Sequence, residues 1–231
     1  MRIALVEDDP AQAQQMAEWL SNASYNPHWF ANGQTFMKSF RRESFDLIIL
    51  DWNLPDTEGI SLLRQIRETD PSIGTLFITS RNDENDIVAA LEDGADDYLV
   101  KPTRHAETLA RISSVMRRTY KYNKEDKDVC FAPFTLHRDH FTVDFGDETI
   151  QLTSKEFEVA CFMFQNHDRL LSRNHILESV WGVSSDLTTR TVDVHISKIR
   201  LKLGLKPDRG WRMVSVYKYG YRLESLDGTK G

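Results

Sequence analysis

The stretch LIILDWNLPDTEG (47–59) joins four apolar residues to a carboxylate and then to a segment containing Pro55. A short apolar run bounded by turn signals is typical of a fully buried strand. Four further β-rich runs accompany it: IALV (3–6), NPHWFA (26–31), LFIT (76–79) and DYLV (97–100). Helical patterns such as 58–69 separate these runs. The alternation predicts an α/β domain with a doubly wound, five-stranded parallel sheet of the flavodoxin-like kind.

The second half of the chain has a different pattern. Apolar and polar residues alternate over 134–152, which indicates an antiparallel sheet. Three helical segments follow, the third over about 189–203, and 213–223 has the pattern of a hairpin. A small sheet, three helices and a hairpin are typical of an α+β winged helix-turn-helix. We therefore predict an α/β domain, a polar linker, a winged-helix domain and a tail, over residues 1–118, 119–128, 129–224 and 225–231.

Composition narrows the class of protein. The 231 residues have a charged content of 28% and a mean hydropathy of -0.47, and no apolar run approaches the ~20 residues of a membrane span. Carboxylates interrupt the apolar start MRIALVEDDP, so we expect no export signal, a cytoplasmic protein and no membrane partner. Cys130 and Cys161 have no Cys-x-x-Cys spacing, which favours reduced, packed thiols.

Charge is distributed unevenly along the chain. The net charge is -6, but residues 188–222 contain nine Lys and Arg against two Asp. A basic surface of this kind indicates contact with nucleic acid, although a solvated basic face opposite an acidic partner has the same composition.

Charged side chains follow three of the predicted strands. Glu7 and Asp8 follow the first, Asp51 the third and Lys101 the fifth. The carboxyl ends of parallel strands meet at one edge of a sheet, and carboxylates held together there favour a hard cation such as Mg2+. Asp51 is then the natural nucleophile for a phosphoryl group. Lys101 would neutralise charge, and Thr79 would donate its hydroxyl to a phosphoryl oxygen.

Other interpretations of single residues stay open at this point. Acidic residues after a strand also cap helices, so Asp8 or Asp9 can be the N-cap of the first helix. Lys101 and Pro102 can form a simple turn, and Tyr98 alone is more typical of a half-buried strand aromatic.

Taken together, VEDD (6–9), LIILDWNLPDTEG, FITSR (77–81) and GADDYLVKP (94–102) make residues 1–118 resemble the receiver domains of two-component response regulators. The resemblance implies that Asp51 accepts a phosphoryl group from a phosphohistidine of a sensor histidine kinase. It also implies roles for Thr79 and Lys101, and a switch aromatic in Tyr98. The implied ligands of Mg2+ are Glu7, Asp8, Asp51 and the backbone carbonyl of Asn53.

The same resemblance implies a homodimer of the phosphorylated form. Its interface would be the face built by the fourth helix, fifth strand and fifth helix of this domain, through Asp96, Asp97, Glu107, Arg111 and Arg118. Two residues depart from the family pattern: Thr103 stands where Phe is common, and Ile87 stands where a basic residue usually pairs with the acid that corresponds to Glu107. We expect these departures to weaken or alter the dimer and the switch.

The basic region contains the helix RTVDVHISKIRLKL (190–203). At ~100° per residue, its apolar seam of Val192, Ile196, Ile199 and Leu203 spans about 60° and should pack inward. The other side carries Arg190, Val194, Ser197 and Lys198. Such a helix fits a major groove, where Val194 would meet a thymine methyl group, although a single amphipathic helix is more often only solvated on this side.

Four motifs make residues 129–224 resemble the winged-helix effector domain of OmpR/PhoB-type response regulators: LTSKEFEV (152–159), LSRNHILESVWG (171–182), the helix 190–203 and YGYRL (219–223). The resemblance implies binding to promoter DNA through a recognition helix and a wing. The implied contact residues are Arg190, Val194, His195, Ser197, Lys198, Arg200, Tyr217 and Lys218. In relatives the loop equivalent to SSDLTT (184–189) can contact RNA polymerase, and here it is either such a contact or a connector.

The predicted function is a phosphorylation-dependent DNA-binding transcriptional regulator that is not an enzyme. One competing hypothesis is an aspartyl-phosphate phosphohydrolase, but such enzymes place a second carboxylate two residues after the nucleophile, where this chain has Asn53. The other is a DNA-binding module that acts without phosphorylation, which the intact Asp51, Thr79 and Lys101 argue against.

Overall fold

The computed structural model describes residues 1–119, 128–182 and 188–226. The chain divides into two compact units, Met1–Lys121 and Tyr122–Gly231, each with its own apolar core. Most of the predicted linker, 119–128, lies outside the described residues. Within the described ranges, no helix is both long enough and apolar enough to cross a bilayer.

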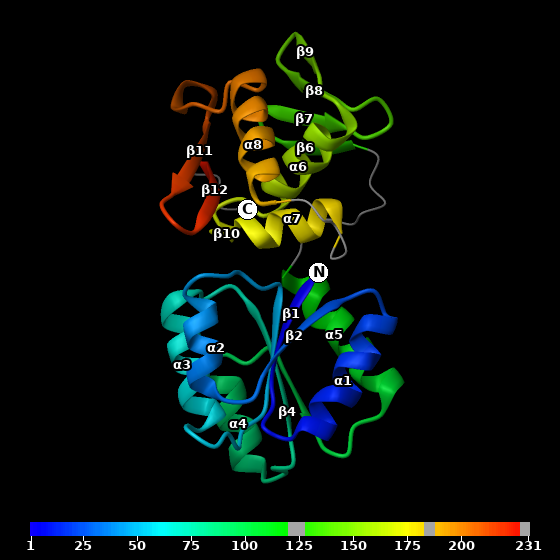
Figure 1. Ribbon diagram of the computed structural model, residues 1–231, viewed down its shortest axis with the longest axis vertical. Coiled ribbons are helices and arrows are strands. Elements are labelled where there is room, and N and C mark those ends of the chain that lie inside the picture. Colours follow the sequence, from blue (N-terminus) through cyan, green and yellow to red (C-terminus); the bar gives the residue numbers. More distant parts are fainter. Residues whose placement is uncertain (120–127, 183–187, 227–231) are drawn as a thin grey trace. The chain divides into compact units, whose positions relative to one another are not determined.

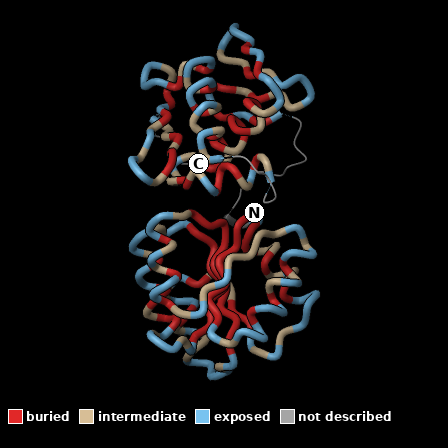
Figure 2. The backbone as a smooth tube through the Cα atoms, in the orientation of Figure 1, coloured by how far each residue is buried: buried red, intermediate tan, exposed pale blue. Residues whose placement is uncertain are grey.

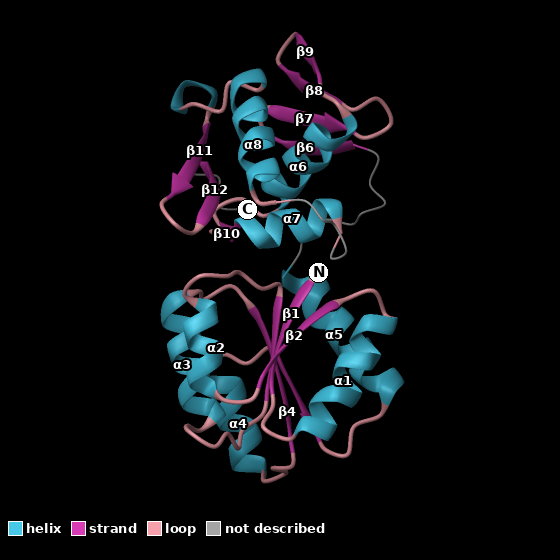
Figure 3. Ribbon diagram, viewed as in Figure 1, coloured by secondary structure: helices cyan, strands magenta, loops and turns pink. Residues whose placement is uncertain are grey.

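The N-terminal unit is a five-stranded parallel sheet with the order β2-β1-β3-β4-β5 (Figures 1 and 3). Its strands coincide with the five predicted runs to within two residues: β1 (Arg2–Val6), β2 (Asn26–Phe30), β3 (Leu47–Leu50), β4 (Gly74–Thr79) and β5 (Asp97–Val100). The strand order reverses between β1 and β3, which is where doubly wound sheets place their functional groups. The predicted α/β fold is confirmed.

Helices cover both faces of this sheet. Because side chains alternate along each strand, successive residues pack against the helices on opposite faces. Ala4 and Val6 of β1 pack on one face, and Ile3 and Leu5 pack on the other. The first face is covered by α2 (Gly33–Phe40), α3 (Gly59–Thr69) and α4 (Glu84–Glu92), and the second by α1 (Pro10–Asn22) and α5 (His105–Thr119). Figure 2 shows the consequence: most of the sheet is buried, as continuous apolar strands require.

The C-terminal unit opens with an antiparallel sheet in the order β6-β7-β8-β9, and three helices and a second sheet in the order β10-β12-β11 follow (Figure 1). The predicted hairpin is β11 with β12, and its turn contains Lys218 at a φ of 59°. These elements form the predicted winged helix-turn-helix, with α8 as its third helix. Their bounds are β6 (Asp128–Phe131), β7 (Phe134–His137), β8 (Thr142–Phe145), β9 (Glu148–Gln151), α6 (Ser154–Gln165), β10 (Leu171–Ser172), α7 (Arg173–Trp181), α8 (Arg190–Lys202), β11 (Trp211–Val216) and β12 (Gly220–Ser225).

An aromatic cluster holds the layers of the C-terminal unit together. Phe164 of α6 lies between Phe131 of β6 and Trp211 of β11, with ring centroids 5.2 and 5.0 Å away. Close approach of β12 to β10 requires Gly220, because a Cβ at this position would lie 1.9 Å from the carbonyl oxygen of Leu171. The β11–β12 hairpin, which is the wing of this domain, is therefore held against β10 beside its turn.

The start of α6 is fixed by a capping box. The Thr153 hydroxyl accepts a hydrogen bond from the backbone N–H of Glu156, and the Glu156 carboxylate accepts one from the backbone N–H of Thr153. Lys202, at the end of α8, donates to the same carboxylate at 2.7 Å. The capping box therefore also joins α6 to α8.

We expect Thr153→Ala to lower the stability of the C-terminal unit by about 1 kcal/mol, because it leaves a helix N–H group without its acceptor. This corresponds to a fall in melting temperature of roughly 4–8 °C for a domain of this size. Thermal unfolding followed by circular dichroism measures it. Ser154→Ala, one residue later on the exposed side, is the control and should change stability by less than about 0.5 kcal/mol. Equal effects of the two substitutions would contradict the importance of the cap.

Candidate phosphoacceptor site and nucleic-acid interface

The predicted carboxylates converge at the carboxyl edge of the parallel sheet. Glu7, Asp8 and Asp51 each offer one oxygen, and these oxygens lie within 4.8 Å of one another. They come together because β1 and β3 are hydrogen-bonded neighbours, and the N–H of Asp51 donates to the carbonyl of Val6. Glu7 and Asp51 are buried, whereas Asp8 is exposed to solvent.

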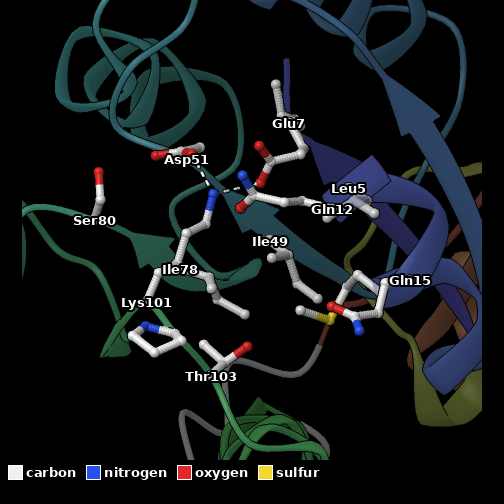
Figure 4. A pocket seen from close by; sticks show the side chains of 13 residues that line it. Leu5, Glu7, Gln12, Gln15, Ile49, Asp51, Ile78, Ser80, Lys101 and Thr103 are labelled. Carbon is white, nitrogen blue, oxygen red and sulfur yellow. Dashed lines mark hydrogen bonds and ion pairs between the residues drawn. The ribbon is translucent and has the colours of Figure 1, made fainter. Parts of the chain in front are cut away.

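Lys101 compensates the negative charge of this cluster. Its Nζ donates to Glu7 Oε2 at 2.7 Å and to Asp51 Oδ2 at 2.6 Å (Figure 4). Burial acts to lower the pKa of Lys101, but the hydrogen bonds and charges of the two carboxylates outweigh it and raise that pKa. Burial also raises the pKa of Glu7 despite the neighbouring ammonium group. The site is thus a desolvated cluster held together by one cation.

The adjacent aspartates Asp8 and Asp9 have separate functions. Asp9 is the N-cap of α1, and its side chain accepts hydrogen bonds from the N–H groups of Ala11 and Gln12. A hydrogen bond from the Gln12 side-chain amide, together with these backbone bonds, lowers the pKa of Asp9. Asp8 instead lies in the carboxylate cluster. The N-cap interpretation therefore applies to Asp9, and the position of Asp8 is compatible with a metal ligand.

The loop after Asp51 folds tightly around the site. The N–H of Asn53 donates to Asp51 Oδ1 at 3.3 Å, and Asn53 forms an antiparallel bridge with Glu58. At position 59 only glycine fits, because a Cβ there would lie 2.2 Å from the Asp51 carbonyl oxygen. The packed loop holds the backbone of residues 51–53 beside the carboxylates.

This donor set fits Mg2+. Carboxylate and backbone carbonyl oxygens are its preferred protein ligands, and a Mg2+ ion usually keeps several waters. Glu7, Asp8 and Asp51 supply carboxylates from one edge of the sheet, and the exposure of Asp8 leaves that side open to solvent. A bound divalent cation would offset the carboxylate charge that Lys101 balances only in part.

An open cavity of about 400 Å³ adjoins Asp51 and Lys101. Met16, Ile49, Ile78 and Thr103 are among the residues that line it. Figure 4 shows Ile78 and Thr103 below Asp51. Thr103 contributes a small side chain to the lining of this cavity.

Arg81 is a site residue that the sequence analysis did not single out. Its guanidinium lies over the Trp52 ring, 5.0 Å from the centroid, and bonds to Asn53 Oδ1 at 3.4 Å and Asp86 at 3.2 Å. The Arg81 carbonyl accepts a hydrogen bond from the Tyr98 hydroxyl at 3.0 Å. Its place two residues after Thr79, at the end of the fourth strand, was the only available signal.

Tyr98 and Thr79 are both buried in this structure. Tyr98 stacks on Phe77 with ring centroids 5.8 Å apart, and desolvation raises the pKa of its phenol to about 12. Thr79 ends β4, is fully buried, and its hydroxyl accepts a hydrogen bond from the N–H of Arg81 at 3.4 Å. Tyr98 therefore points into the core, and its hydroxyl bonds to the same residue that covers Trp52.

The predicted dimer face contains ion pairs within one chain. Arg111 contacts Asp97 at 3.1 Å and Glu107 at 3.3 Å. Asp96 accepts hydrogen bonds from the Arg67 side chain of α3 and from the backbone N–H of Thr75, so it stabilises the fold of its own domain. Ile87 is half-buried against the core, and the side chain of Arg118 lies outside the described residues. Val88 and Leu91 of α4 are exposed.

On α8 the predicted apolar seam is buried and the opposite side is exposed to solvent. Val192, Ile196 and Ile199 are at most 1% exposed. Arg190, Ser197 and Lys198 are exposed, and Val194 is 51% exposed. The helix thus presents a basic face with an apolar residue in its middle.

The remaining predicted DNA-contact residues differ in their exposure to solvent and in their contacts within the protein. The His195 ring packs edge-on against Trp181 and bonds to the carbonyl of Thr191 at 2.8 Å. Arg200 is half-buried. Tyr217 and Lys218, at the tip of the wing, are exposed, and the Lys218 Nζ lies 5.3 Å from the Tyr217 ring centroid. Most of the predicted RNA polymerase loop, 184–189, lies outside the described residues.

Comparison with known families agrees with this geometry. Residues 3–113 match the response regulator receiver domain, and residues 147–223 match the C-terminal domain of transcriptional regulatory proteins. The acidic edge of the first domain and the basic helix of the second belong to the same chain. The class defined by the fold and the two sites is a response regulator with a DNA-binding output domain.

Relatives along the whole chain narrow the class. The chain is 31% identical to the sensory transduction protein RegX3 of Mycobacterium tuberculosis over 96% of its own length and 98% of that protein. It is 33% identical to the transcriptional regulatory protein CreB of Escherichia coli over 88% and 90% of the two chains. A CheY-like receiver domain protein from Methanospirillum hungatei covers 51% of this chain and 94% of its own at 27% identity and a TM-score of 0.50. The chain belongs to the OmpR/PhoB type of two-component response regulators and is a phosphorylation-dependent, DNA-binding transcriptional regulator.

We expect Asp8→Asn to weaken Mg2+ binding by roughly tenfold or more, because the cation loses a charged ligand. Asp9→Asn is the matched control: asparagine caps a helix as well as aspartate does, and Asp9 lies on the helix side of the site, so affinity should stay near that of the unsubstituted chain. Calorimetric titration of each protein with MgCl2 measures the difference. A larger loss for Asp9→Asn than for Asp8→Asn would reverse the assignment.

Proposed function

We propose that Asp51 accepts the phosphoryl group from a phosphohistidine of a sensor histidine kinase, with Mg2+ held by Glu7, Asp8, Asp51 and the carbonyl of Asn53. A carboxylate oxygen of Asp51 attacks phosphorus, the phosphorus–nitrogen bond breaks, and its electron pair leaves with the imidazole. Bound Mg2+ supplies charge neutralisation for the transferred group. The observation that carries this proposal is the convergence of three carboxylates and Lys101 at one edge of the sheet.

The proposal assigns Lys101 and Thr79 to the phosphorylated state. The Lys101 ammonium, which now contacts Asp51, turns to a phosphoryl oxygen, and the Thr79 hydroxyl donates to another. Movement of Thr79 toward the phosphoryl group changes the Thr79–Arg81 segment, to which the Tyr98 hydroxyl is bonded. Tyr98 is then the aromatic residue that reports phosphorylation to the face formed by α4, β5 and α5.

Asp51 acts in this proposal as a stoichiometric acceptor rather than as the nucleophile of a phosphohydrolase. Position 53 carries an amide, and Arg81 bonds to its oxygen, so no carboxylate activates water there. Slow hydrolysis of the aspartyl phosphate remains compatible with this site.

The α4–β5–α5 face is the proposed homodimer interface of the phosphorylated form. Exposed Val88 and Leu91 supply apolar surface, and Asp97, Glu107 and Arg111 supply charges that can exchange partners between two chains. Surface ion pairs contribute about 0 to 1 kcal/mol each, so the absence of a cation at Ile87 should noticeably weaken the association. The dimer would bring two output domains to one promoter.

DNA is contacted, in this proposal, by α8 in the major groove and by the tip of the wing. Arg190 and Lys198 reach base edges or phosphates, and Val194 contacts a thymine methyl group. His195, Ser197, Arg200, Tyr217 and Lys218 complete the proposed contact set. RNA polymerase is a further proposed partner, through the loop 184–189.

We expect Mg2+ and a small phosphodonor to modify the unsubstituted chain and to leave Asp51→Asn unmodified, because an amide lacks the nucleophilic oxygen. Phosphate-affinity electrophoresis measures the modification. Equal incorporation in both proteins would rule out Asp51 as the acceptor.

Beryllofluoride, a mimic of the phosphoryl group, links this test to function. The unsubstituted chain should gain affinity for DNA and sediment as a dimer when it is added, and Asp51→Asn should do neither. A single unchanged monomer under both conditions would refute the proposed dimer and leave the acceptor assignment intact.

Two substitutions on α8 separate positioning on the duplex from reading of its sequence. Lys198→Ala should weaken binding to target and scrambled duplexes alike and lower the salt dependence, since each neutralised phosphate releases about 0.9 counterion. Val194→Ala should keep the salt slope and lose discrimination at one thymine-bearing position, because it removes apolar contact but no charge. Fluorescence anisotropy over a range of salt concentrations measures both. If neither variant differs from the unsubstituted chain, α8 is not the recognition helix.

A further inference from the structure

One acidic residue stands in the recognition helix. Asp193 is the only Asp or Glu between residues 190 and 207, in a stretch that otherwise carries basic charge. Its Oδ1 accepts a hydrogen bond from the Tyr221 hydroxyl at 2.6 Å and from Arg173 Nε at 2.8 Å. The Arg173 guanidinium also lies over the Tyr221 ring, 4.9 Å from its centroid. Asp193 therefore joins three elements: α8, the first turn of α7 and strand β12 of the wing.

The apolar packing of α8 and the hydrogen bonds of Asp193 constrain the helix in different ways. Val192, Ile196 and Ile199 form a seam of dispersion contacts, which depend little on direction, whereas hydrogen bonds require a defined geometry. Asp193 follows the first residue of this seam, at the end of α8 that carries Arg190 and Val194. Its two hydrogen bonds add a directional contact to this seam.

The two side chains that donate to Asp193, those of Tyr221 and Arg173, are suited to keep these hydrogen bonds in the folded domain. Tyr221 is 7% exposed, and its burial and the neighbouring carboxylate raise the pKa of the phenol, so the hydroxyl stays a donor. The side chain of Arg173 is 25% exposed. Beside the turn of the same hairpin, Gly220 lets β12 approach β10 closely, and β10 leads directly into α7. The wing, α7 and α8 therefore share one junction.

An isolated carboxylate on this helix would oppose DNA binding, because it repels phosphates. Its charge is instead paired with Arg173. We propose that Asp193 is a positioning residue for DNA recognition: without contacting DNA, it fixes α8 and the wing in the relative orientation at which both reach one target sequence. The inference rests on the proposed DNA contacts of α8 and the wing, and it assigns the accuracy of recognition to a contact within the protein.

Two substitutions test this junction in different ways. Tyr221→Phe removes one hydroxyl and no charge, and Asp193→Asn keeps the shape of the side chain but removes the ion pair with Arg173. The full-length chain with Mg2+ and beryllofluoride is titrated against a duplex that the unsubstituted chain has selected from a random pool, and against a scrambled duplex. Asp147→Asn, which removes the same charge from the exposed turn between β8 and β9, is the control.

We expect both substitutions to reduce the ratio of target to scrambled affinity by roughly tenfold, the factor that one hydrogen bond to a charged group contributes. Affinity for the scrambled duplex should not fall in either variant, since no phosphate contact is lost. The control should keep both affinities. Melting curves show whether each variant is folded at the temperature of the titration.

Other outcomes overturn the proposal. An unchanged ratio in both folded variants shows that the junction does not set recognition. A parallel fall on both duplexes shows that it only stabilises the domain. If the unsubstituted chain itself selects no duplex from the pool, the proposed DNA contacts fail before the junction is tested, so the two failures are distinguishable.

Discussion

The constraint on which the N-terminal domain depends is the meeting of like charges at one edge of a parallel sheet. Glu7 and Asp51 follow neighbouring strands, so the fold forces their carboxylates together in a buried place. Removing the partner of a buried charge costs about 3–5 kcal/mol, and here one ammonium group, from Lys101, pairs with both carboxylates. A cation or an anionic group bound beside these carboxylates would compete for the contacts of Lys101. A change of charge at this edge of the sheet would therefore also move the Lys101 side chain.

Arg81 links this edge of the sheet to the α4–β5–α5 face, because it contacts a residue at each. Arg81 covers Trp52, the residue after Asp51, with its guanidinium, and it holds the Tyr98 hydroxyl with its carbonyl. Its side chain contacts the loop that follows Asp51, and its backbone lies two residues after Thr79. In the proposed switch, a shift of Thr79 would reach Tyr98 through the peptide chain itself, because the Tyr98 hydroxyl bonds to the Arg81 carbonyl.

Sequence periodicity was sufficient for the strands, the sheet class and the convergence of Glu7, Asp51 and Lys101, since these follow from alternation and from parallel strand order. It could not distinguish Asp8 from Asp9, because the two side chains are chemically identical and only the fold places Asp9 at the helix N-terminus and Asp8 in the carboxylate cluster. Arg81 and Asp193 were also beyond it: their partners include Asn53 and Tyr221, each 28 residues away in the chain. Such contacts depend on tertiary packing that no local pattern encodes.

In the C-terminal domain, tertiary packing also decides how many basic side chains are unpaired and available to bind phosphate. The window 188–222 carries nine basic residues, but four of them, Lys202, Arg209, Arg212 and Arg222, are paired with Glu156, Glu148 and Glu224. All three glutamates lie outside the window, one of them only two residues beyond it. The charge available to phosphates is therefore smaller than the sequence count, and it is concentrated on the exposed side of α8 and at the wing tip. A small surplus limits the affinity that charge alone can supply, so the proposed positioning role of Asp193 would act on selectivity rather than on this charge-dependent affinity.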